Sequence, residues 1–409
     1  MSRLDVDTST AIVVLRRDVD DFQRCALAVA RSAGRLGIRV FSVRRNAREP
    51  ATQSRYASGS LALSPSAPED EWVDALIEMR PRLGRAILVP IDDLAAVVVS
   101  DHQDRLANYY ALPLAPAGIQ RRLASKRELW RVCQELDIPT PSCAFPANEK
   151  ELREQASELG YPVVMKRSER WFAPRDSSAP SVFIAHTWEQ LVAAYDRMES
   201  DATPQVMLQE YIPGGSDAVW TYNGYAADRG ECLCAFTGRR LRQQGPRTGQ
   251  TTLGVSAANE TVEALGRRLL RELDYRGIVD IGFHYDRRDG AYKLFDVNPR
   301  LGSSFRMFVA DNGIDVLRAM HLDLTGRPVP DSTMTDGRKW IDELGDVATC
   351  IKLTRERALG LRSWASSLKG VDEAAWWALD DPLPFFGMGA QALPKAMRLL
   401  TARNGQWTG

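Results

Sequence analysis

The sequence YKLFDVNPRLGSSFRMF, from Tyr292 to Phe308, starts like a buried strand and then turns polar where the strand should end. Its apolar run contains Asp296 and Asn298, two residue types that a strand inside a hydrophobic core normally excludes. Pro299 cannot donate to a sheet ladder, so the strand is expected to stop there, immediately before Arg300. The stretch therefore predicts polar side chains gathered at the end of one strand.

Strand side chains alternate between faces, so Asp296 and Asn298 are expected on one face, with Phe295 and Val297 on the other. Mg²⁺ prefers oxygen ligands and keeps water and phosphate oxygens in its remaining positions, so a carboxylate and an amide can form part of a metal site beside a nucleoside triphosphate. Arg300 would extend near the same place, where a guanidinium can bind a phosphoryl or carboxylate oxygen. Taken alone, the stretch is also compatible with a strand end built from turn-forming residues.

The composition indicates a globular protein of two or three domains, because the chain has 409 residues, of which 44% are hydrophobic and 26% are charged. Lysine plus arginine and aspartate plus glutamate both number 53, so the formal net charge is zero. Without a global positive field, binding of nucleic acid is not expected.

The six cysteines form no CxxC pair, and the four histidines have no zinc-ligand spacing, so reduced cysteines are expected. The N-terminus has no signal-peptide pattern, and no segment approaches the ~18 apolar residues of a membrane span. These features predict a cytoplasmic protein.

The first third of the chain alternates strand and helix patterns, which predicts a small parallel sheet with crossover helices, as in a Rossmann-like domain. The strand-like segments are TAIVVL, IRVFSV and RAILVP, and the helical segments are Asp20 to Leu36 and EDEWVDALIEM. The last of these strands is followed by Asp92 and Asp93. The first is followed by RRDVDDF, which has no glycine to let a pyrophosphate approach, so a dinucleotide site is not expected there.

From Ala124 onward the pattern changes to a helix, several strands broken by glycines, a second helix and a hairpin. In chain order these segments are SKRELWRVCQELDIPTPS, YPVVMKRS, QVMLQEYIPGG, AVWTYNGY, ECLCAFTGRRLRQ, VEALGRRLLREL and RGIVDIGFHYDRRDGAYKLFDV. In the last of them DRRDG supplies the turn between two alternating runs.

Together these motifs resemble the ATP-grasp superfamily, whose last metal-binding strand commonly reads Glu/Asp-x-Asn-Pro-Arg. The resemblance covers roughly residues 124–326. It implies an α/β protein with the ATP-grasp fold, in which two lobes clamp ATP. The implied regions are a Rossmann-like N-terminal domain in residues 1–120, an ATP-grasp domain in residues 121–330 and a helical, tryptophan-rich extension in residues 331–409. Within the superfamily, FTGRRLRQ, the opening stretch and DDPLPF resemble carboxylate-amine ligases related to D-aspartate ligase.

The resemblance implies that ATP binds together with Mg²⁺ (or Mn²⁺). The residues that match the nucleotide-binding positions are Lys126 and Lys166 for the phosphates, main-chain groups at Glu210, Tyr211 and Ile212 for adenine, and Asp217 for the ribose. Asp296 and Asn298 match the metal-binding positions.

Two departures from the family pattern stand out. The segment after Lys166 has no glycine where many members have a glycine-rich loop over the phosphates. Gly282 stands where the first hairpin strand usually carries a metal ligand. Alternation places Asp280 on the same face, toward Asn298, so we expect Asp280 to contribute charge to the metal site, directly or through water. The alternative is that Asp280 pairs with an arginine and Gly282 only relieves crowding.

The family chemistry predicts an ADP-forming carbon-nitrogen ligase. A carboxylate attacks the terminal phosphate of ATP, and an amine then displaces phosphate from the resulting acylphosphate. Arg300 is expected to act on the phosphoryl group, and Arg240 or Arg306 to hold a substrate carboxylate, as Arg239 and Arg242 also can. Surface positions on a solvated strand are the alternative for Arg239, Arg240 and Arg242.

Two other functions stay open. A catalytically impaired ATP-binding regulatory or scaffold protein is favoured by Gly282 and by the glycine-free segment. An NAD-dependent oxidoreductase has only the N-terminal alternation in its favour. The expected partners of the ligase are small carboxylate and amine substrates, such as amino acids or a cell-envelope precursor, and a second copy in a homodimer. The basic C-terminal tail around Lys395 and Arg398 either packs on the protein or contacts a membrane.

Overall fold

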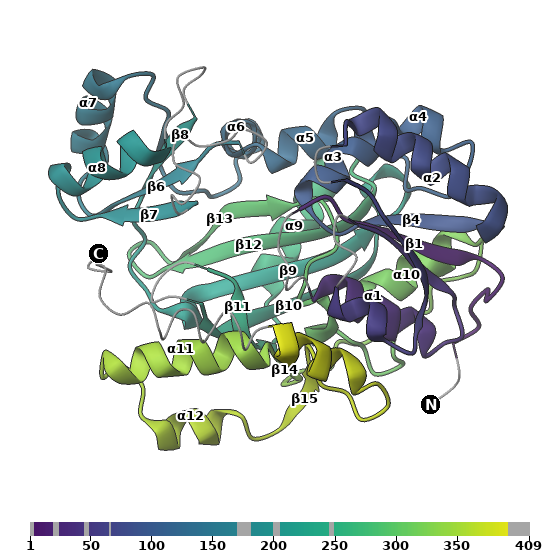
Figure 1. The fold of residues 1–409 in the computed structure, drawn as a ribbon. Coiled ribbons are helices and arrows are strands. Elements are labelled where there is room, and N and C mark those ends of the chain that lie inside the picture. Colours follow the sequence, from purple (N-terminus) through teal and green to yellow (C-terminus); the bar gives the residue numbers. More distant parts are fainter. Residues whose placement is uncertain are drawn as a thin grey trace.

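The computed structural model describes residues 4–18, 24–44, 49–64, 67–169, 181–198, 205–244 and 249–391, and its strands form three sheets (Figure 1). One four-stranded sheet belongs to the N-terminal region, and a second four-stranded sheet forms a small lobe. A seven-stranded sheet runs between them and carries the strand of the opening stretch. The glycine-free segment at 170–180 and the basic tail lie outside the described residues.

The N-terminal sheet is parallel throughout, in the order β3-β2-β1-β4, which confirms the predicted parallel sheet. Its elements are β1 (Ala11–Leu15), α1 (Cys25–Gly34), β2 (Val40–Arg44), η1 (Pro50–Gln53), β3 (Ala57–Ala62), α2 (Glu69–Leu83), β4 (Ala86–Pro90), α3 (Asp93–Asp101) and α4 (Gln103–Leu106). The sequence patterns do not predict β3, because ASGSLA is an edge strand of mostly small residues, alternately exposed and half-buried.

The small lobe is an antiparallel sheet in the order β5-β8-β6-β7, packed against two helices. The chain reaches it through α5 (Ile119–Ala124) and α6 (Lys126–Glu135). The lobe consists of β5 (Cys143–Ala144), α7 (Glu149–Leu159), β6 (Val163–Arg167), β7 (Val182–Ala185), α8 (Trp188–Met198) and β8 (Val206–Glu210). Leu152 of α7 and Leu191 of α8 pack with Met165 and Leu208 of the sheet. This core holds β6 and β8 side by side.

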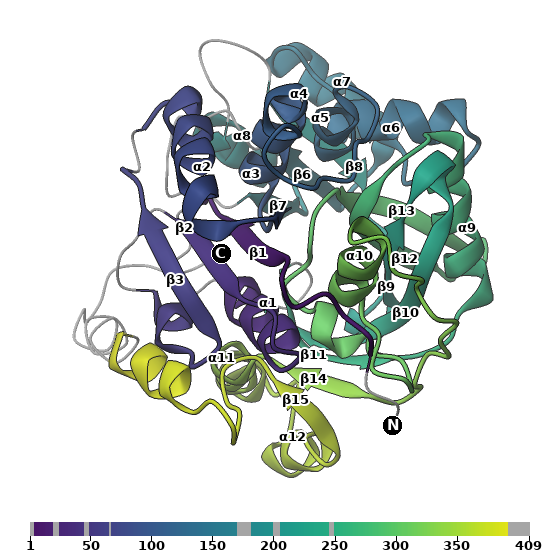
Figure 2. The same ribbon diagram turned by 90° about the vertical axis from the view of Figure 1, so that its right-hand side faces the viewer.

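The large sheet has the order β13-β12-β9-β10-β11-β14-β15. Its first elements are η2 (Ser216–Ala218), β9 (Val219–Ala226), η3 (Asp228–Gly230), β10 (Cys232–Gln243), β11 (Thr251–Ser256), α9 (Glu260–Glu272), β12 (Gly277–Asp286), β13 (Ala291–Asn298), η4 (Phe305–Met307) and α10 (Val316–Leu324). α9 covers one face, and the apolar core on the other face joins the sheet to α10 and α1 (Figure 2). The N-terminal domain therefore packs directly on the large sheet. β12 and β13 pair antiparallel, which confirms the predicted hairpin.

The C-terminal region extends the large sheet and closes back on the N-terminal domain. Its elements are β14 (Lys339–Ile341), α11 (Glu343–Arg355), α12 (Leu361–Ser367) and β15 (Val371–Ala374), so a region expected to be helical also supplies two strands. Asp381 of the DDPLPF motif accepts hydrogen bonds from Arg31 Nε (3.0 Å) and Ser54 Oγ (2.7 Å). The limits proposed for the three domains remain predictions. Within the described ranges, every helix is too short or too polar to cross a membrane.

Candidate functional site

The end of the β12–β13 hairpin contains a β-bulge that changes which side chains face the site. Gly282 pairs with Asp296, but Phe283 pairs with Leu294, so Phe295 is the extra residue. A Cβ built on Gly282 would lie 2.8 Å from the Phe295 ring, and Val297 is buried in the opposite core. The expectation that Phe295 shares a face with Val297 is therefore wrong, because the bulge interrupts strict alternation.

The predicted oxygen ligands lie together at this strand end. Asp280 pairs with Asn298 across the hairpin, a register that the bulge sets. Asn298 Nδ2 donates to Asp296 Oδ2 (3.2 Å) and to the main-chain oxygen of Asp280 (3.5 Å). Lys126 Nζ forms an ion pair with Asp296 Oδ1. Both oxygens of Asp296 thus have partners from the protein itself.

The buried surroundings raise the pKa of Asp280 from 3.8 to about 6. Desolvation is the main cause, and the nearby charges of Asp296 and Asp93 add to it, whereas Arg300 and Arg240 act in the opposite direction. A cation near this carboxyl would favour its charged form. In the described part of the chain, no group of three or more His, Cys, Asp or Glu could hold a metal, so a metal here would need the amide oxygen of Asn298 and non-protein ligands.

Two lysines from different elements converge on the same place. Lys166 Nζ lies 5.2 Å from the centre of the Phe295 ring and donates to Gln209 Oε1 (2.8 Å). Burial, assisted by the charge of Lys126, lowers the pKa of Lys166 from 10.5 to about 8. The backbone N–H of Lys126 donates to the oxygen of Ser168 (2.9 Å), which joins the start of α6 to the end of β6. Lys126 and Lys166 are therefore placed together, as the sequence predicts.

The residues matched to the adenosine lie at the other end of the hairpin. Glu210 accepts from Lys293 Nζ (3.2 Å) and Arg288 Nη2 (3.1 Å), and both cations also pair with buried Asp286. Those two cations lower the pKa of Asp286 well below its usual value. This network joins the end of β8, where Tyr211 and buried Ile212 follow, to the hairpin turn.

Asp217, matched to the ribose, is mostly exposed and lies 3.6 Å from Arg287 Nη2. The carboxylate is therefore accessible at the same end of the hairpin as the Glu210 network.

Arg300 connects the hairpin to the N-terminal domain. Its Nε donates to Asp93 Oδ1 (3.0 Å), its Nη2 to Asn298 Oδ1 (3.0 Å) and its Nη1 to the Leu301 oxygen (3.2 Å). Burial alone would lower the pKa of Arg300, but the carboxylates of Asp93 and Asp280 outweigh it and raise the pKa. Sequence reasoning noted Asp93 without giving it a role. Its position after a parallel strand is the signal that could have identified it, since such strand ends line ligand sites.

Among the other candidate arginines, Arg240 on β10 lies within range of the charges of Asp280 and Asp296. Its Nη1 donates to Gln243 Oε1 (3.1 Å) and to the Gly249 oxygen (2.7 Å), while its Nε is buried and has no hydrogen-bond partner. Burial lowers the pKa of Arg240, and the charges of Asp280 and Asp296 oppose this effect.

Three further arginines behave differently from Arg240. Arg242 forms a two-point ion pair with Asp346, and Arg239 is exposed. Arg306 donates to both oxygens of Glu373 and to Asp315 Oδ2. The contacts of Arg242 and Arg306 favour structural roles, and their roles in substrate binding remain untested predictions.

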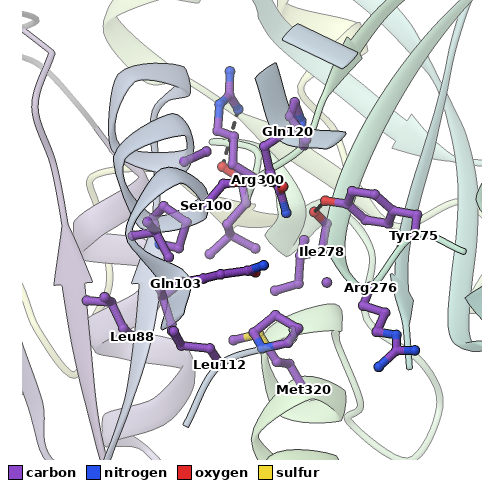
Figure 3. Close-up of a pocket in the computed structure, with 18 residues that line it drawn as sticks. Leu88, Ser100, Gln103, Leu112, Gln120, Tyr275, Arg276, Ile278, Arg300 and Met320 are labelled. Carbon is purple, nitrogen blue, oxygen red and sulfur yellow. Dashed lines mark hydrogen bonds between the residues drawn. The ribbon is translucent and has the colours of Figure 1, made fainter. Parts of the chain in front are cut away.

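A cavity of about 50 Å³ lies beside Arg300, between the N-terminal domain and the start of β12 (Figure 3). Ser100, Gln103 and Gln120 lie on one side of it, and Tyr275 and Ile278 on the other. Ser100 Oγ donates to Gln120 Oε1 (2.8 Å), and the Tyr275 hydroxyl donates to the Ile278 oxygen (2.8 Å). The two hydroxyl groups thus have partners within the protein, and Arg300 is the residue that the cavity shares with the candidate site.

Comparison with known proteins finds relatives over part of the chain. No family model matches. The D-aspartate ligase of Enterococcus faecium is 26% identical over 240 residues, which cover 57% of this chain and 57% of the ligase. The N-terminal section of the carbamoyl phosphate synthase large chain of Methanopyrus kandleri is 25% identical over 190 residues, which cover 44% of this chain and 32% of that protein. The chain thus spans about half or less of the length of these curated relatives.

Solved structures match over most of the chain. An ADP complex of N5-carboxyaminoimidazole ribonucleotide synthetase has a TM-score of 0.64 at 13% identity, covering 87% of both chains. The biotin carboxylase domain of the 2-oxoglutarate carboxylase of Hydrogenobacter thermophilus has a TM-score of 0.58 at 15% identity, covering 80% of this chain and 73% of that one. At these identities the similarity establishes the fold, and it confirms the architecture predicted from the sequence.

Proposed function

Because the chain belongs to the ATP-grasp superfamily, we propose that it is an ATP-dependent ligase that joins a carboxylate to an amine and releases ADP and phosphate. The observation that supports this most directly is the convergence of Lys126 and Lys166 on Asp296. Two cations beside a carboxylate suit a triphosphate with its bound metal, because phosphoryl transfer depends mainly on positioning and charge stabilisation.

The reaction begins when a substrate carboxylate oxygen attacks the terminal phosphorus of ATP, and the bond from that phosphorus to the bridging oxygen breaks as ADP leaves. The amine then attacks the acylphosphate carbon, phosphate leaves, and the nitrogen loses a proton. Lys126 and Lys166 hold the phosphate oxygens, and Arg300 orients the group being transferred. Glu210, Tyr211, Ile212 and Asp217 lie farther along the hairpin, where they hold the adenosine.

The donors at the strand end fit Mg²⁺ or Mn²⁺, since Asp296, Asn298 and Asp280 all offer hard oxygen atoms. When bound, the metal neutralises charge on the phosphate oxygens. In the structure, Asp296 forms an ion pair with Lys126 and accepts a hydrogen bond from the Asn298 amide nitrogen. We infer that Lys126 exchanges Asp296 for a phosphate oxygen when ATP binds. Asp296 and the amide oxygen of Asn298 would then be the groups that hold the metal.

The proposed substrates are small molecules, with an amino acid as one of them. The similarity to D-aspartate ligase supports this class, and Arg240 offers a guanidinium beside the site for a second carboxylate. A cell-envelope precursor as the amine, a homodimeric assembly and a cytoplasmic location, where ATP is available, belong to the same proposal.

A second candidate is an ATP-binding regulatory protein without turnover. The observation that favours it is the Phe295 ring packed over Gly282, which occupies space beside Asp296. The two candidates differ in one measurable property, since only the ligase consumes ATP in the presence of its substrates.

The test is a screen of D- and L-amino acids, singly and in pairs with amines, for phosphate released from ATP and Mg²⁺, followed by the mass of the product. We expect ADP, phosphate and an amide. Formation of AMP and pyrophosphate contradicts the acylphosphate route. ATP binding by calorimetry without turnover in any pair supports the regulatory candidate.

A further inference from the structure

α11 carries apolar side chains on the face that it turns to solvent. Leu344, Val347 and Ile351 are 40%, 44% and 49% exposed, and with exposed Ala348 they follow the i, i+3, i+4, i+7 spacing of one helix face. The buried face instead carries Asp346, which pairs with an arginine of β10. α11 therefore differs from a usual surface helix, because its apolar side chains face solvent and a charged side chain faces the protein.

A second group of exposed apolar residues adjoins the start of this helix. The backbone N–H of Trp377 donates to Glu343 Oε1 (2.7 Å), so the segment after β15 lies against the first turn of α11. Eight of the eleven large apolar side chains that are exposed in the described ranges fall between residues 344 and 386. We define the C-terminal apolar patch as Leu344, Val347, Ile351, Trp377, Leu379, Leu383 and Phe386.

Basic residues flank the patch. Lys352 and Arg355 continue the exposed face of α11 toward its C-terminal end. Over residues 344 to 386, the span of the patch, the exposed charged side chains comprise five cations and three anions, namely Lys352, Arg355, Arg357, Arg362 and Lys369 against Glu356, Asp372 and Asp380. Asp380 is paired with Arg35, so the cations predominate around α11. This local charge contrasts with the zero net charge of the whole chain.

We propose that the C-terminal apolar patch binds the surface of an anionic lipid bilayer. An apolar helix face beside a cationic flank offers the two signals that peripheral membrane binding requires, and tryptophan favours the bilayer interface. Because a helix face is convex, it can insert into a flat and deformable surface such as a lipid bilayer. A second copy of the chain fits less well, because a symmetric contact would bring two cationic flanks together. This inference does not depend on the proposed reaction.

Co-sedimentation with vesicles tests the proposal. The full chain is mixed at low salt with vesicles of phosphatidylcholine alone or with about one third phosphatidylglycerol. We expect binding to the anionic vesicles, little binding to the neutral ones, and weaker binding as salt is raised. Absence of binding to anionic vesicles at low salt overturns the proposal.

Two sets of substitutions separate the apolar and the charged contributions. The triple variant Leu344→Gln, Val347→Gln, Ile351→Gln should weaken vesicle binding by about tenfold or more, because it removes the apolar contact. The double variant Lys352→Glu, Arg355→Glu should weaken it by about tenfold and reduce its salt dependence.

The matched control replaces the exposed apolar residues that lie elsewhere, Tyr109, Leu114 and Tyr161, with Gln and should bind normally. Thermal unfolding checks that all variants are folded. Equal binding by the wild type and both patch variants overturns the proposal. Self-association that the triple variant abolishes, without vesicle binding, assigns the patch to a second copy instead.

Discussion

Arg300 and Arg306 come from one short stretch of sequence, yet the fold places them in different surroundings. Both are largely buried, and in both neighbouring carboxylates raise the pKa against the effect of burial. Arg306 donates to three carboxylate oxygens, two from Glu373 and one from Asp315. Arg300 donates to one carboxylate oxygen, one amide oxygen and one backbone oxygen.

This difference indicates which arginine can exchange partners. The contacts of Arg306 are charge-assisted and join β15 to the segment before α10, so leaving them would break three hydrogen bonds to carboxylate oxygens. One partner of Arg300 is the neutral amide of Asn298, so in the proposed reaction Arg300 can exchange this contact for a phosphoryl oxygen without leaving a carboxylate unpaired. The hydrogen-bond partners of a buried arginine therefore indicate better than its pKa whether it can bind a ligand.

The largest effect is expected from Asp296→Ala, which removes the carboxylate beside the two lysines that we propose as a metal ligand. Turnover should fall by about 10³-fold or more, since the metal and its ligands supply several kcal/mol of transition-state stabilisation. The measurement is phosphate release at saturating Mg²⁺, with thermal unfolding as the check on folding. Near-normal turnover of the folded variant would show that Asp296 is not a metal ligand.

Arg306→Met should act on stability rather than on chemistry. Without Arg306, Glu373 keeps Arg338 and Asp315 keeps Arg318 and Ser32. The loss in the free energy of unfolding should therefore stay below the ~3–5 kcal/mol that a fully unpaired buried charge costs. Urea unfolding measures the loss, and turnover per folded molecule should stay within about twofold of the wild type. A stable variant with impaired turnover would instead support the catalytic role first considered for Arg306.

Arg300→Lys should act mainly on turnover, which should fall by about a hundredfold. Its loss of stability should be smaller than that of Arg306→Met. A lysine keeps the charge but cannot make the fork of contacts to the phosphoryl group, Asp93 and Asn298. Steady-state kinetics should show the loss mainly in kcat. If Arg300→Lys instead lost stability and kept its turnover, as expected for Arg306→Met, the proposed difference in role between the two arginines would be wrong.

The pKa of Lys166, about 8 in the protein without ATP, predicts that ATP affinity depends on pH. Lysine is charged below its pKa and neutral above it, so affinity should be greater at pH 7 than at pH 9, by up to about tenfold. Calorimetric titration with ATP at both values measures the change. Lys166→Arg stays charged across this range and should flatten the dependence, whereas an unchanged dependence in that variant would assign the titration to another group.

The smallest effect is expected from Asp280→Asn, which removes a charge near the metal while keeping the shape of the side chain. The Mg²⁺ concentration for half-maximal activity should rise by about fivefold, the size expected for one charge acting through water. Mn²⁺ titration followed by electron spin resonance gives a readout independent of activity. An unchanged metal affinity would mean that Asp280 serves only to balance Arg300 and Arg240.

Local patterns in the sequence were sufficient to predict the hairpin and the two lysine-bearing elements. DRRDG lies between two runs of strand-forming residues, and the pairing of Asp286 with Ala291 through Phe283 with Leu294 follows from that turn. SKRELWRV begins with a serine whose hydroxyl accepts the Glu128 N–H, an N-cap that can be read from the sequence alone. Such features depend on residues close in sequence, so the sequence alone is enough to predict them.

Strict alternation failed at Phe295, because a bulge depends on the partner strand as well as on the strand itself. Gly282 on β12 provides the space that the Phe295 ring fills, and neither residue alone indicates the other. The edge strand β3 was missed for a related reason, since its pairing with β2 compensates for a weak apolar pattern.

What the sequence by itself determined is the parallel N-terminal sheet, the β12–β13 hairpin, the polar strand end at Asp296 and Asn298, and the cations that could bind near it. Only the tertiary structure decided that Arg300 pairs with Asp93, 207 positions away in the chain, and that Arg306 pairs with Glu373. It also turned the apolar face of α11 outward, because Asp346 is held inside by Arg242. Ion pairs of this kind link residues far apart in the sequence, and their partners are chosen by which elements the packed cores bring together.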